Sequence, residues 1–272
     1  MQPGLAALIH PRSSPEFFAS YAANEPFVVH GLDESVRALT RLPLLGSLET
    51  LLNGWPNPVQ VHLPDVADEA SAIDAAPGDA RKLFANGMGL LFNDVHTLSP
   101  ELAKWLAAIC GDLRLSALTQ GRCLVYATPR GKGTGAHFDQ NVNFVLQLHG
   151  TKKWFLAPNH NVERPMTRHT MGLPVDPELE TYVKTPMPFH MAADTRVIVL
   201  EPGSLLFVPR GVWHSTHASS DALSLNFTYS APTWIDLLMA ALRSRLAQSS
   251  EWRETATPAS PERFEALLRE LA

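Results

Sequence analysis

The pattern of hydrophobic and polar positions changes twice along the chain. Up to residue 113, short apolar runs alternate with segments of helical spacing, and beyond residue 232 helical spacing returns. From 114 to 231 the apolar residues fall into short runs separated by Gly and Pro, which favours a sandwich or barrel over βαβ units. We therefore expect an N-terminal helical and strand region (1–113) packed on a β core (114–231), then a C-terminal helical segment (232–272). The stretch 158–190 interrupts the β core as an insertion.

Cap residues and apolar runs place the expected elements of the N-terminal region. Ser14 and Ser99, each followed by a proline, have the signature of helix N-caps. Segment 34–58 has helical spacing in part, whereas 64–80 is small and acidic and is expected to form an exposed loop or a short helix. Apolar runs with the length of single strands cover 27–30, 59–63 and 89–94.

Composition excludes several classes of protein. The hydrophobic fraction of 45% fits a globular chain rather than a disordered one, and the net charge of −5 argues against nucleic-acid binding. No apolar run approaches the roughly 20 residues needed to span a bilayer, and the N-terminus lacks the basic and apolar regions of a signal peptide. Cys110 and Cys123 cannot build a disulfide framework. We therefore expect a cytoplasmic protein without membrane or nucleic-acid partners.

His137 and Asp139 form the first candidate metal site. Residues i and i+2 of a strand point to the same face, so this imidazole and carboxylate can converge on one ion. The signal is weak alone, because 11 histidines and 27 acidic residues in 272 positions make about one such pair expected by chance.

His214 supplies a third candidate ligand. A turn at 209–211 ends an apolar strand and delivers His214 rigidly at the start of the next one. Two histidines and one carboxylate form the facial triad of non-heme Fe(II) oxygenases, which leaves coordination positions open for cosubstrate and oxygen. His217 is a rival ligand, but its odd offset from His214 on an extended segment predicts that it faces the other way.

Lys152 is the next unusual residue, because it lies in an apolar strand that follows the turn at 149–150. A lysine there needs solvent or an anionic partner. Its neighbour Lys153 is expected to be solvated, whereas Lys152 suits a carboxylate that reaches in from the metal.

Three blocks of sequence carry a resemblance to a known family: TGAHFDQNVNFVLQLHGTKKWFLAP, EPGSLLFVPRGVWH and LNFTY. Over about 121–230 they resemble the Jumonji C (JmjC) branch of the cupin superfamily, and most of all its ribosomal-oxygenase and asparaginyl-hydroxylase-like members. The resemblance implies a mainly β fold with flanking helices around a double-stranded β-helix (jelly-roll) core. It also implies that His137, Asp139 and His214 bind Fe(II), and that Lys152, at the family's spacing from the first histidine, grips 2-oxoglutarate.

Four further residues match family positions around the cosubstrate. Thr134 matches a hydroxyl that contacts the same carboxylate as the lysine, and Asn143 matches a polar position beside the metal. Asn226 and Tyr126 match residues near the cosubstrate in some members. Where some relatives have an asparagine two residues before the tyrosine, this chain has Leu124, so we expect the substrate or that side of the pocket to differ from those relatives.

The resemblance implies an Fe(II)- and 2-oxoglutarate-dependent dioxygenase that uses O2 to hydroxylate a carbon of a peptide, protein or amino-acid side chain, with succinate and CO2 as coproducts. Demethylation begins with the same hydroxylation and stays open. Two other readings also stay open: a metal-dependent cupin enzyme that does not use 2-oxoglutarate, and a non-catalytic cupin binding module.

Two segments outside the core carry further expectations. The insertion either caps the metal and reads the substrate or is a solvated connector, and its candidate residues are His160, Arg164, Arg168, His169 and Tyr182. Arg210, beside the turn before His214, is a candidate substrate contact. The C-terminal segment holds one apolar helical stripe and a further short helix at 261–271, and the stripe either packs on the barrel or forms a homodimer. The stripe consists of Trp234, Leu237, Leu238, Ala241, Leu242 and Leu246.

Overall fold

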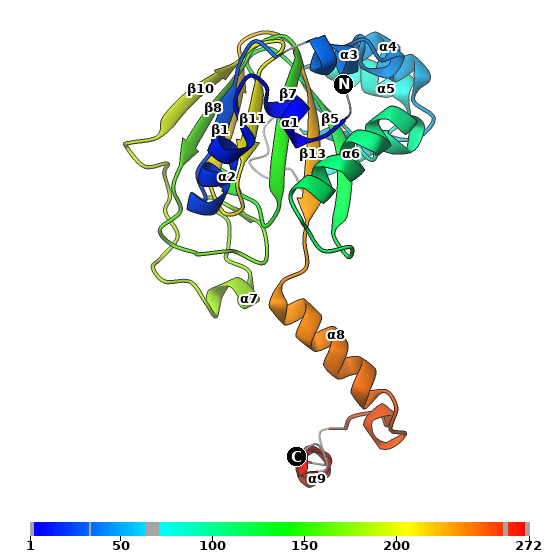
Figure 1. Cartoon of the computed structure of the whole chain (residues 1–272), viewed down its shortest axis with the longest axis vertical. Helices are drawn as coiled ribbons and strands as arrows, with labels where there is room; N and C mark the ends of the chain where they lie inside the picture. Colours follow the sequence, from blue (N-terminus) through cyan, green and yellow to red (C-terminus); the bar gives the residue numbers. More distant parts are fainter. Residues whose placement is uncertain (1–2, 33, 64–70, 258–260, 270–272) are drawn as a thin grey trace. The chain divides into compact units, whose positions relative to one another are not determined.

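The computed structural model describes residues 3–32, 34–63, 71–257 and 261–269 (Figure 1). The chain divides into two compact units, Met1–Ala231 and Pro232–Ala272. In the part of the chain that the structure describes, no helix is both long enough and apolar enough to cross a membrane.

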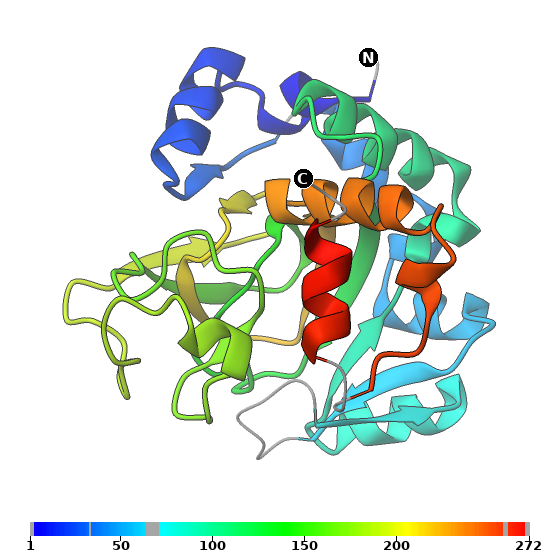
Figure 2. The ribbon, with the colours of Figure 1, turned by 90° about the horizontal axis from the view of Figure 1, so that it is seen from below.

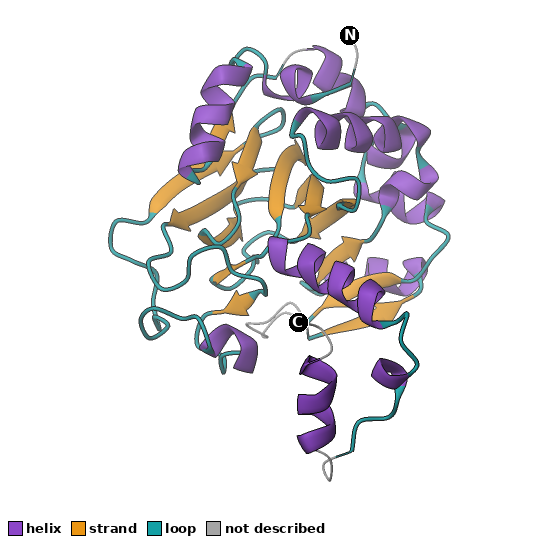
Figure 3. Cartoon of the chain, turned by 60° about the horizontal axis from the view of Figure 1, so that its bottom comes forward, coloured by secondary structure: helices purple, strands orange, loops and turns teal. Residues whose placement is uncertain are grey.

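Two antiparallel sheets form the first unit, as the strands in Figure 3 show. The larger sheet has the order β1-β11-β7-β13-β5-β4-β2-β3, and the smaller sheet has the order β10-β8-β12-β6-β9. This arrangement confirms the expected jelly-roll fold, in which strands distant in sequence pair across a sandwich. The strands of the larger sheet are β1 (Phe27–Val29), β2 (Val59–His62), β3 (Ala72–Ala75), β4 (Gly89–Phe92), β5 (Gln120–Thr128), β7 (Val142–His149), β11 (Leu205–Val208) and β13 (Ala222–Ser230). Those of the smaller sheet are β6 (His137–Phe138), β8 (Lys152–Ala157), β9 (His169–Thr170), β10 (Arg196–Leu200) and β12 (Trp213–Ala218).

The N-terminal helices pack on the larger sheet and share one apolar core with it. Leu8, Phe17 and Trp105 from the helices join Val125 and Phe227 from the strands in this core. The shared core explains why residues 1–231 form one unit. Separating the helices from this face of the sheet would expose apolar surface to water. The helices are α1 (Leu5–Ile9), α2 (Ser14–Ala23), α3 (Glu34–Thr40), η1 (Pro43–Leu45), α4 (Leu48–Gly54), α5 (Pro77–Ala85), η2 (Val95–Leu98) and α6 (Pro100–Asp112).

The helix starts were predicted with mixed accuracy. Ser99 caps α6, where its side chain accepts a hydrogen bond from the backbone N–H of Leu102, as expected. The predicted cap at Ser14 was wrong, because Ser14 is already helical and Ser13 is the cap. A capping box decides this register: the Ser13 hydroxyl accepts from the Glu16 N–H, and the Glu16 carboxylate accepts from the Ser13 N–H.

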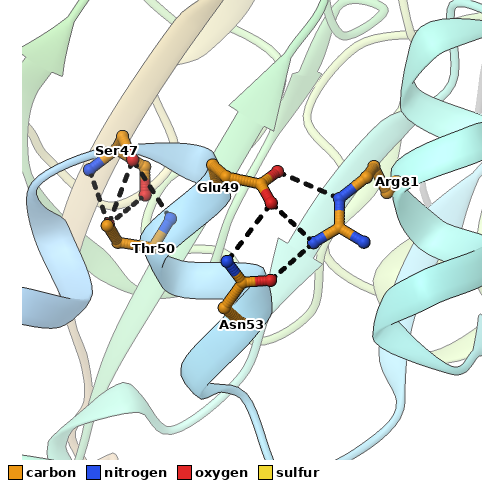
Figure 4. A network of polar contacts seen from close by, with 5 residues as sticks. All are labelled: Ser47, Glu49, Thr50, Asn53 and Arg81. Carbon is orange, nitrogen blue, oxygen red and sulfur yellow. Dashed lines mark hydrogen bonds and ion pairs between the residues drawn. The ribbon is translucent and has the colours of Figure 1, made fainter.

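A polar network joins α4 to α5 on the outside of this region (Figure 4). Arg81 of α5 donates to both carboxylate oxygens of Glu49, each at 2.9 Å, and to the amide oxygen of Asn53 at 2.7 Å.

Residues 71–80 were expected to form a loop or short helix. That expectation was wrong for β3, which pairs with β2 and so takes its conformation from a distant strand. Residues 64–70 of the same prediction lie outside the described residues.

The segment 158–190, which we expected to be an insertion in the β core, includes β9 and the short helix α7 (Pro177–Glu180). Its side chains build a small apolar core of their own, in which Val162 and Leu179 pack with Phe138 and Trp213 of the smaller sheet. The insertion and helices α4 and α5 lie on opposite sides of the first unit (Figure 2). The insertion is thus packed against the strands that carry His137 and His214.

The second unit consists of α8 (Trp234–Leu246), the 3-10 turn η3 (Glu251–Arg253) and α9 (Pro261–Arg269). Both predicted C-terminal helices are therefore confirmed. Helix α8 begins with a capping box between Thr233 and Asp236, and Arg263 of α9 forms ion pairs with Glu251 and Glu254.

Alternation along the strands gives the larger sheet one apolar face and one partly polar face. In β13, Leu225, Phe227 and Tyr229 point into the core shared with the helices. Residues Ser224, Asn226 and Thr228 therefore point the other way, between the two sheets, because successive side chains of a strand alternate. The space between the sheets is apolar around Val145 and Leu206 and polar toward the candidate site.

Candidate functional site

His137, Asp139 and His214 come together in the smaller sheet. Strand β6 pairs with β12 in a register that places His137 opposite His214, with ring centroids 4.1 Å apart. One ligand atom from each of the three side chains lies within 4.8 Å of the other two. Both histidines are 4% exposed. Such a cluster of two imidazoles and one carboxylate is the donor set that suits a non-heme Fe(II) ion.

Backbone carbonyls orient both imidazole rings. The Nδ1 atom of His137 lies 2.8 Å from the carbonyl oxygen of Gly135, and the Nδ1 atom of His214 lies 2.9 Å from that of Val212. Because a carbonyl oxygen can only accept, each Nδ1 carries the proton, and each Nε2 keeps its lone pair. This is the tautomer in which a neutral histidine binds a metal ion through Nε2.

The two oxygens of Asp139 have different partners. Oδ2 lies 3.6 Å from His214 Nε2 and accepts a hydrogen bond of 3.2 Å from the Asn143 side chain. Oδ1 lies 3.4 Å from Arg168 Nε, which comes from the insertion. Burial raises the pKa of Asp139, but His137, His214, Arg168 and Asn143 outweigh it and hold the pKa below its ordinary value. The carboxylate is therefore the stable form.

Lys152 extends from β8 into the same space. Its side chain is buried at 4% exposure, while Lys153 is exposed, as strand alternation predicts. The Lys152 ammonium donates to the Thr128 hydroxyl at 3.1 Å and lies 5.9 and 5.8 Å from the ring centres of Tyr126 and Trp154. These rings stabilise a cation and give it a defined position.

One cavity of about 200 Å³ contains all eight residues singled out from the sequence. They come from both sheets and from the loops before and after β6. The eight are His137, Asp139, His214, Lys152, Thr134, Asn143, Tyr126 and Asn226. His217, the rival ligand, is exposed on the other face of β12. Leu124, the position that departs from some relatives, also lines the cavity.

Sequence reasoning did not assign several cavity residues. On β13 the signal was present, because Ser224, Asn226 and Thr228 alternate with apolar residues. Thr216 follows His214 at the same-face spacing, and its hydroxyl lies 2.9 Å from that of Thr134. Arg168 was named only as part of an insertion that either caps the metal or connects strands, because the insertion has no periodicity that could place a single residue at the metal cluster. The additional residues that line the cavity are Asn141, Trp154, Arg168, Thr216, Ser224 and Thr228.

The cavity fits a metal ion with a polar cosubstrate. Oδ1 of Asn226 and Nε1 of Trp154 are buried without a hydrogen-bond partner among the described residues. Because unpaired buried polar atoms are costly, their position in the cavity wall favours a polar occupant. The donor set and Lys152 together match a divalent ion and a dicarboxylate.

Comparison with known proteins agrees with this geometry. Residues 109–237 match the family model described as a JmjC domain. The uncharacterised protein YxbC of Bacillus subtilis is 34% identical over 258 residues, which cover 93% of this chain and 78% of YxbC. Ribosomal oxygenase 1 of Rattus norvegicus is 29% identical over 214 residues, covering 71% of this chain but 33% of the relative. The chain thus matches about a third of that protein.

Solved structures confirm the fold. The Escherichia coli ribosomal oxygenase YcfD, in complex with cobalt and 2-oxoglutarate, has a TM-score of 0.57 at 17% identity, with 96% of this chain and 66% of YcfD covered. The shared fold agrees with the matched domain and with the sequence relatives. The chain belongs to the family of JmjC-domain proteins.

Proposed function

We propose that this protein is a hydroxylase that uses Fe(II), 2-oxoglutarate and O2 to hydroxylate a carbon of a peptide, protein or amino-acid side chain, with release of succinate and CO2. The observation that carries the proposal is the presence of the three ligands and Lys152 in one cavity. A metal-binding module alone would not require a buried lysine in the same wall, since a buried ammonium is costly without a role.

The three ligand side chains hold the ion and leave it accessible. The Nε2 atoms of His137 and His214 and one oxygen of Asp139 would hold the ion, and three protein ligands would leave coordination positions open for the cosubstrate and O2. Fe(II) with bound 2-oxoglutarate supplies the O2-activating chemistry. The protein's task is therefore to orient the bound groups and to keep water out.

Lys152 receives the distal carboxylate of 2-oxoglutarate. Its stem leaves β8 on the same face as Trp154, and its ammonium is held between Thr128 and two aromatic rings. Thr134 and its partner Thr216 add hydroxyl donors to the cavity wall. A cation and hydroxyls at fixed positions select a dicarboxylate of defined length.

Other cavity residues position the ligands and the cosubstrate. Asn143 donates to Asp139 and accepts from the Thr228 hydroxyl at 2.7 Å, so its amide is held at both ends. Tyr126 lies beside the Lys152 ammonium, and Asn226 directs an amide group into the cavity. We assign these residues to binding of the cosubstrate and to orientation of the metal-binding carboxylate.

Binding of 2-oxoglutarate in the absence of oxygen tests the proposal. Titration calorimetry on the Mn(II)-loaded protein should show binding that needs the metal and is lost in Asp139→Ala. Addition of Fe(II) and air should then produce succinate from 2-oxoglutarate. Metal binding without any response to 2-oxoglutarate would favour a cupin enzyme of another type, and absence of metal binding would favour a binding module.

We further propose that the protein acts in the cytoplasm as a homodimer formed through α8. Trp234, Leu238 and Leu242 recur at four-residue spacing on α8 and are exposed. Light scattering after size exclusion should give twice the chain mass, and Leu238→Glu should give the monomer. A wild-type monomer at micromolar concentration would contradict the dimer.

A further inference from the structure

Arg168 lies across the smaller sheet from the ligand Asp139. Strands β6 and β9 pair antiparallel in a register that puts His137 opposite Thr170. Extending this register by two residues places Arg168 opposite Asp139, and the ion pair between their side chains agrees with that position. Opposite residues on one face of an antiparallel pair lie close enough for their side chains to interact. Strand pairing thus presents a cation to the carboxylate of the metal cluster.

Burial of the next residue directs Arg168 toward the cavity. His169 is 4% exposed, and its ring lies 5.8 Å from the ring of Phe138 and 6.0 Å from that of Trp213, in the apolar core of the insertion. Because neighbouring side chains of an extended segment point to opposite faces, Arg168 leaves the backbone on the other side. It lines the metal cavity there.

Hydrogen bonds fix the backbone around this pair. The Met171 N–H donates to the Ala136 carbonyl at 2.8 Å, and the Gly211 N–H donates to the Asp139 carbonyl at 2.9 Å. The first bond ties the insertion to the residue before His137, and the second ties the ligand to the turn before His214. The position of the insertion relative to the ligand is therefore set by the backbone.

The ion pair engages one oxygen of Asp139 and leaves the other on the metal side. Arg168 Nε lies 3.4 Å from Oδ1, whereas Oδ2 lies 3.6 Å from Nε2 of His214, the atom that would bind the ion. A carboxylate can bind a metal ion through one oxygen or through both. Binding through both would turn Oδ1 away from Arg168 and toward the ion. The cation therefore favours binding through Oδ2 alone.

The binding mode of the carboxylate decides how much of the ion stays accessible. Two imidazoles and one carboxylate oxygen leave positions open for the cosubstrate and for O2. A second oxygen from Asp139 would take one of these positions.

We propose that Arg168 is a positioning residue that keeps Asp139 bound to the metal through a single oxygen, a role that rests on the proposed function because the open position serves the cosubstrate and O2. The segment 158–190 then supplies part of the metal centre and is more than a solvated connector between strands.

Counting the water molecules on a bound Mn(II) ion tests this role without cosubstrate. Relaxation of water protons by the Mn(II)-loaded protein reports the exchangeable waters, and equilibrium dialysis gives the dissociation constant of Mn(II). The variants are Arg168→Met, which removes the charge, and Arg168→Lys, which keeps it. Lys184→Gln is the matched control, because Lys184 belongs to the same segment and pairs with Glu163 at 2.8 Å but does not line the cavity. Circular dichroism shows that each variant is folded.

Arg168→Met should lose about one exchangeable water, because the freed oxygen of Asp139 takes its place. The dissociation constant of Mn(II) should not rise, since a ligand atom is gained and a repelling cation is removed. A distorted cluster would instead bind the metal more weakly, so misfolding cannot imitate this combination. Arg168→Lys should regain the water, and Lys184→Gln should match the wild type.

Two results would overturn the role of Arg168. The first is an unchanged number of waters in folded Arg168→Met, or the same loss in Lys184→Gln. The second is a loss of Mn(II) affinity of roughly 10- to 100-fold with no loss of water, which is the effect of removing an ordinary support of a ligand.

Binding of 2-oxoglutarate separates this proposal from the proposed function. A wild type that binds Mn(II) but not 2-oxoglutarate would refute the proposed function, and the waters of Arg168→Met would still decide how Asp139 binds the metal. Normal 2-oxoglutarate binding by the wild type, with unchanged waters in Arg168→Met, would refute only the role of Arg168.

Discussion

Lys152→Met is the sharpest test of how the cavity holds its cosubstrate. Methionine keeps an unbranched stem of similar length, so the space beside Trp154 stays filled while the charge is removed. Lys153→Met is the matched control, because the next residue on the same strand has the same chemistry but is exposed. The pair separates the effect of a charge inside the cavity from the effect of a charge on the protein surface.

The expected loss follows from the burial of the ammonium. A hydrogen bond to a charged group contributes about 1.5–3 kcal/mol. Lys152 is only 4% exposed, so solvent screens it little and the upper half of this range applies. The dissociation constant of 2-oxoglutarate should therefore rise roughly 50- to 150-fold in Lys152→Met. It should change less than about twofold in Lys153→Met, since an exposed charge at a distance is screened.

Anaerobic calorimetry with Mn(II)-loaded protein measures both constants, and circular dichroism shows that each variant is folded. Metal affinity should be equal in the two variants, because neither residue belongs to the ligand cluster. Equal 2-oxoglutarate affinity in folded Lys152→Met and in wild type would refute the role of Lys152. It would also favour a cupin chemistry that does not use this cosubstrate.

Three further predictions concern the metal and the stability of the fold. Loss of a residue that hydrogen-bonds to a metal ligand costs roughly 10- to 100-fold in metal affinity. Loss of a ligand itself should cost more, so His214→Ala should lower the affinity for Co(II), measured by visible absorption, by more than this factor. Unchanged affinity would exclude His214 as a ligand. Tyr229→Phe removes the buried hydrogen bond of 2.9 Å to the Leu106 carbonyl. This variant should have a free energy of unfolding lower by about 1–3 kcal/mol, as measured by urea denaturation. An unchanged free energy of unfolding would contradict a contribution of that bond to stability. The pKa of Asp94 is lowered, chiefly by hydrogen bonds from Arg122, so this pair stabilises the protein above the unfolded-state pKa and the stability is lost as pH falls through the folded-state pKa. Arg122→Gln should therefore cost about 0.2–1 kcal/mol at neutral pH and less once Asp94 is protonated, when only the hydrogen bond from Arg122 to Asn93 remains. A cost that does not fall in acid would contradict this account.

Local patterns predicted much of the fold and of the candidate site. Gly and Pro spacing with short apolar runs indicated the β core, and Ser99 marked the start of α6. The spacing of His137 and Asp139 on one strand face, with the family resemblance, pointed to the cavity that the structure contains. The resemblance was needed for Lys152, because a single buried lysine has no periodic signal.

Other features depended on partners distant in sequence. Strand β3 is a strand because β2 offers it a pairing edge, although its own sequence, Ala-Ile-Asp-Ala, has only one β-branched residue. Ser13 rather than Ser14 caps α2 because the Glu16 side chain reaches back to it. Arg168 lies in a segment without regular spacing, and its place beside Asp139 is set by the core of the insertion and by Arg210.

The sequence alone determined which residues share a face, because side-chain alternation along a strand is a local property of the extended backbone. Alternation therefore placed His137 on the same face as Asp139, and Ser224 on the same face as Asn226 and Thr228. The tertiary structure decided which faces meet. Pairing of β6 with β12 placed His214 opposite His137, and burial of the apolar face of the larger sheet under the N-terminal helices turned its polar face toward the metal cluster. Such pairing depends on apolar surface buried between distant segments, which no local pattern encodes.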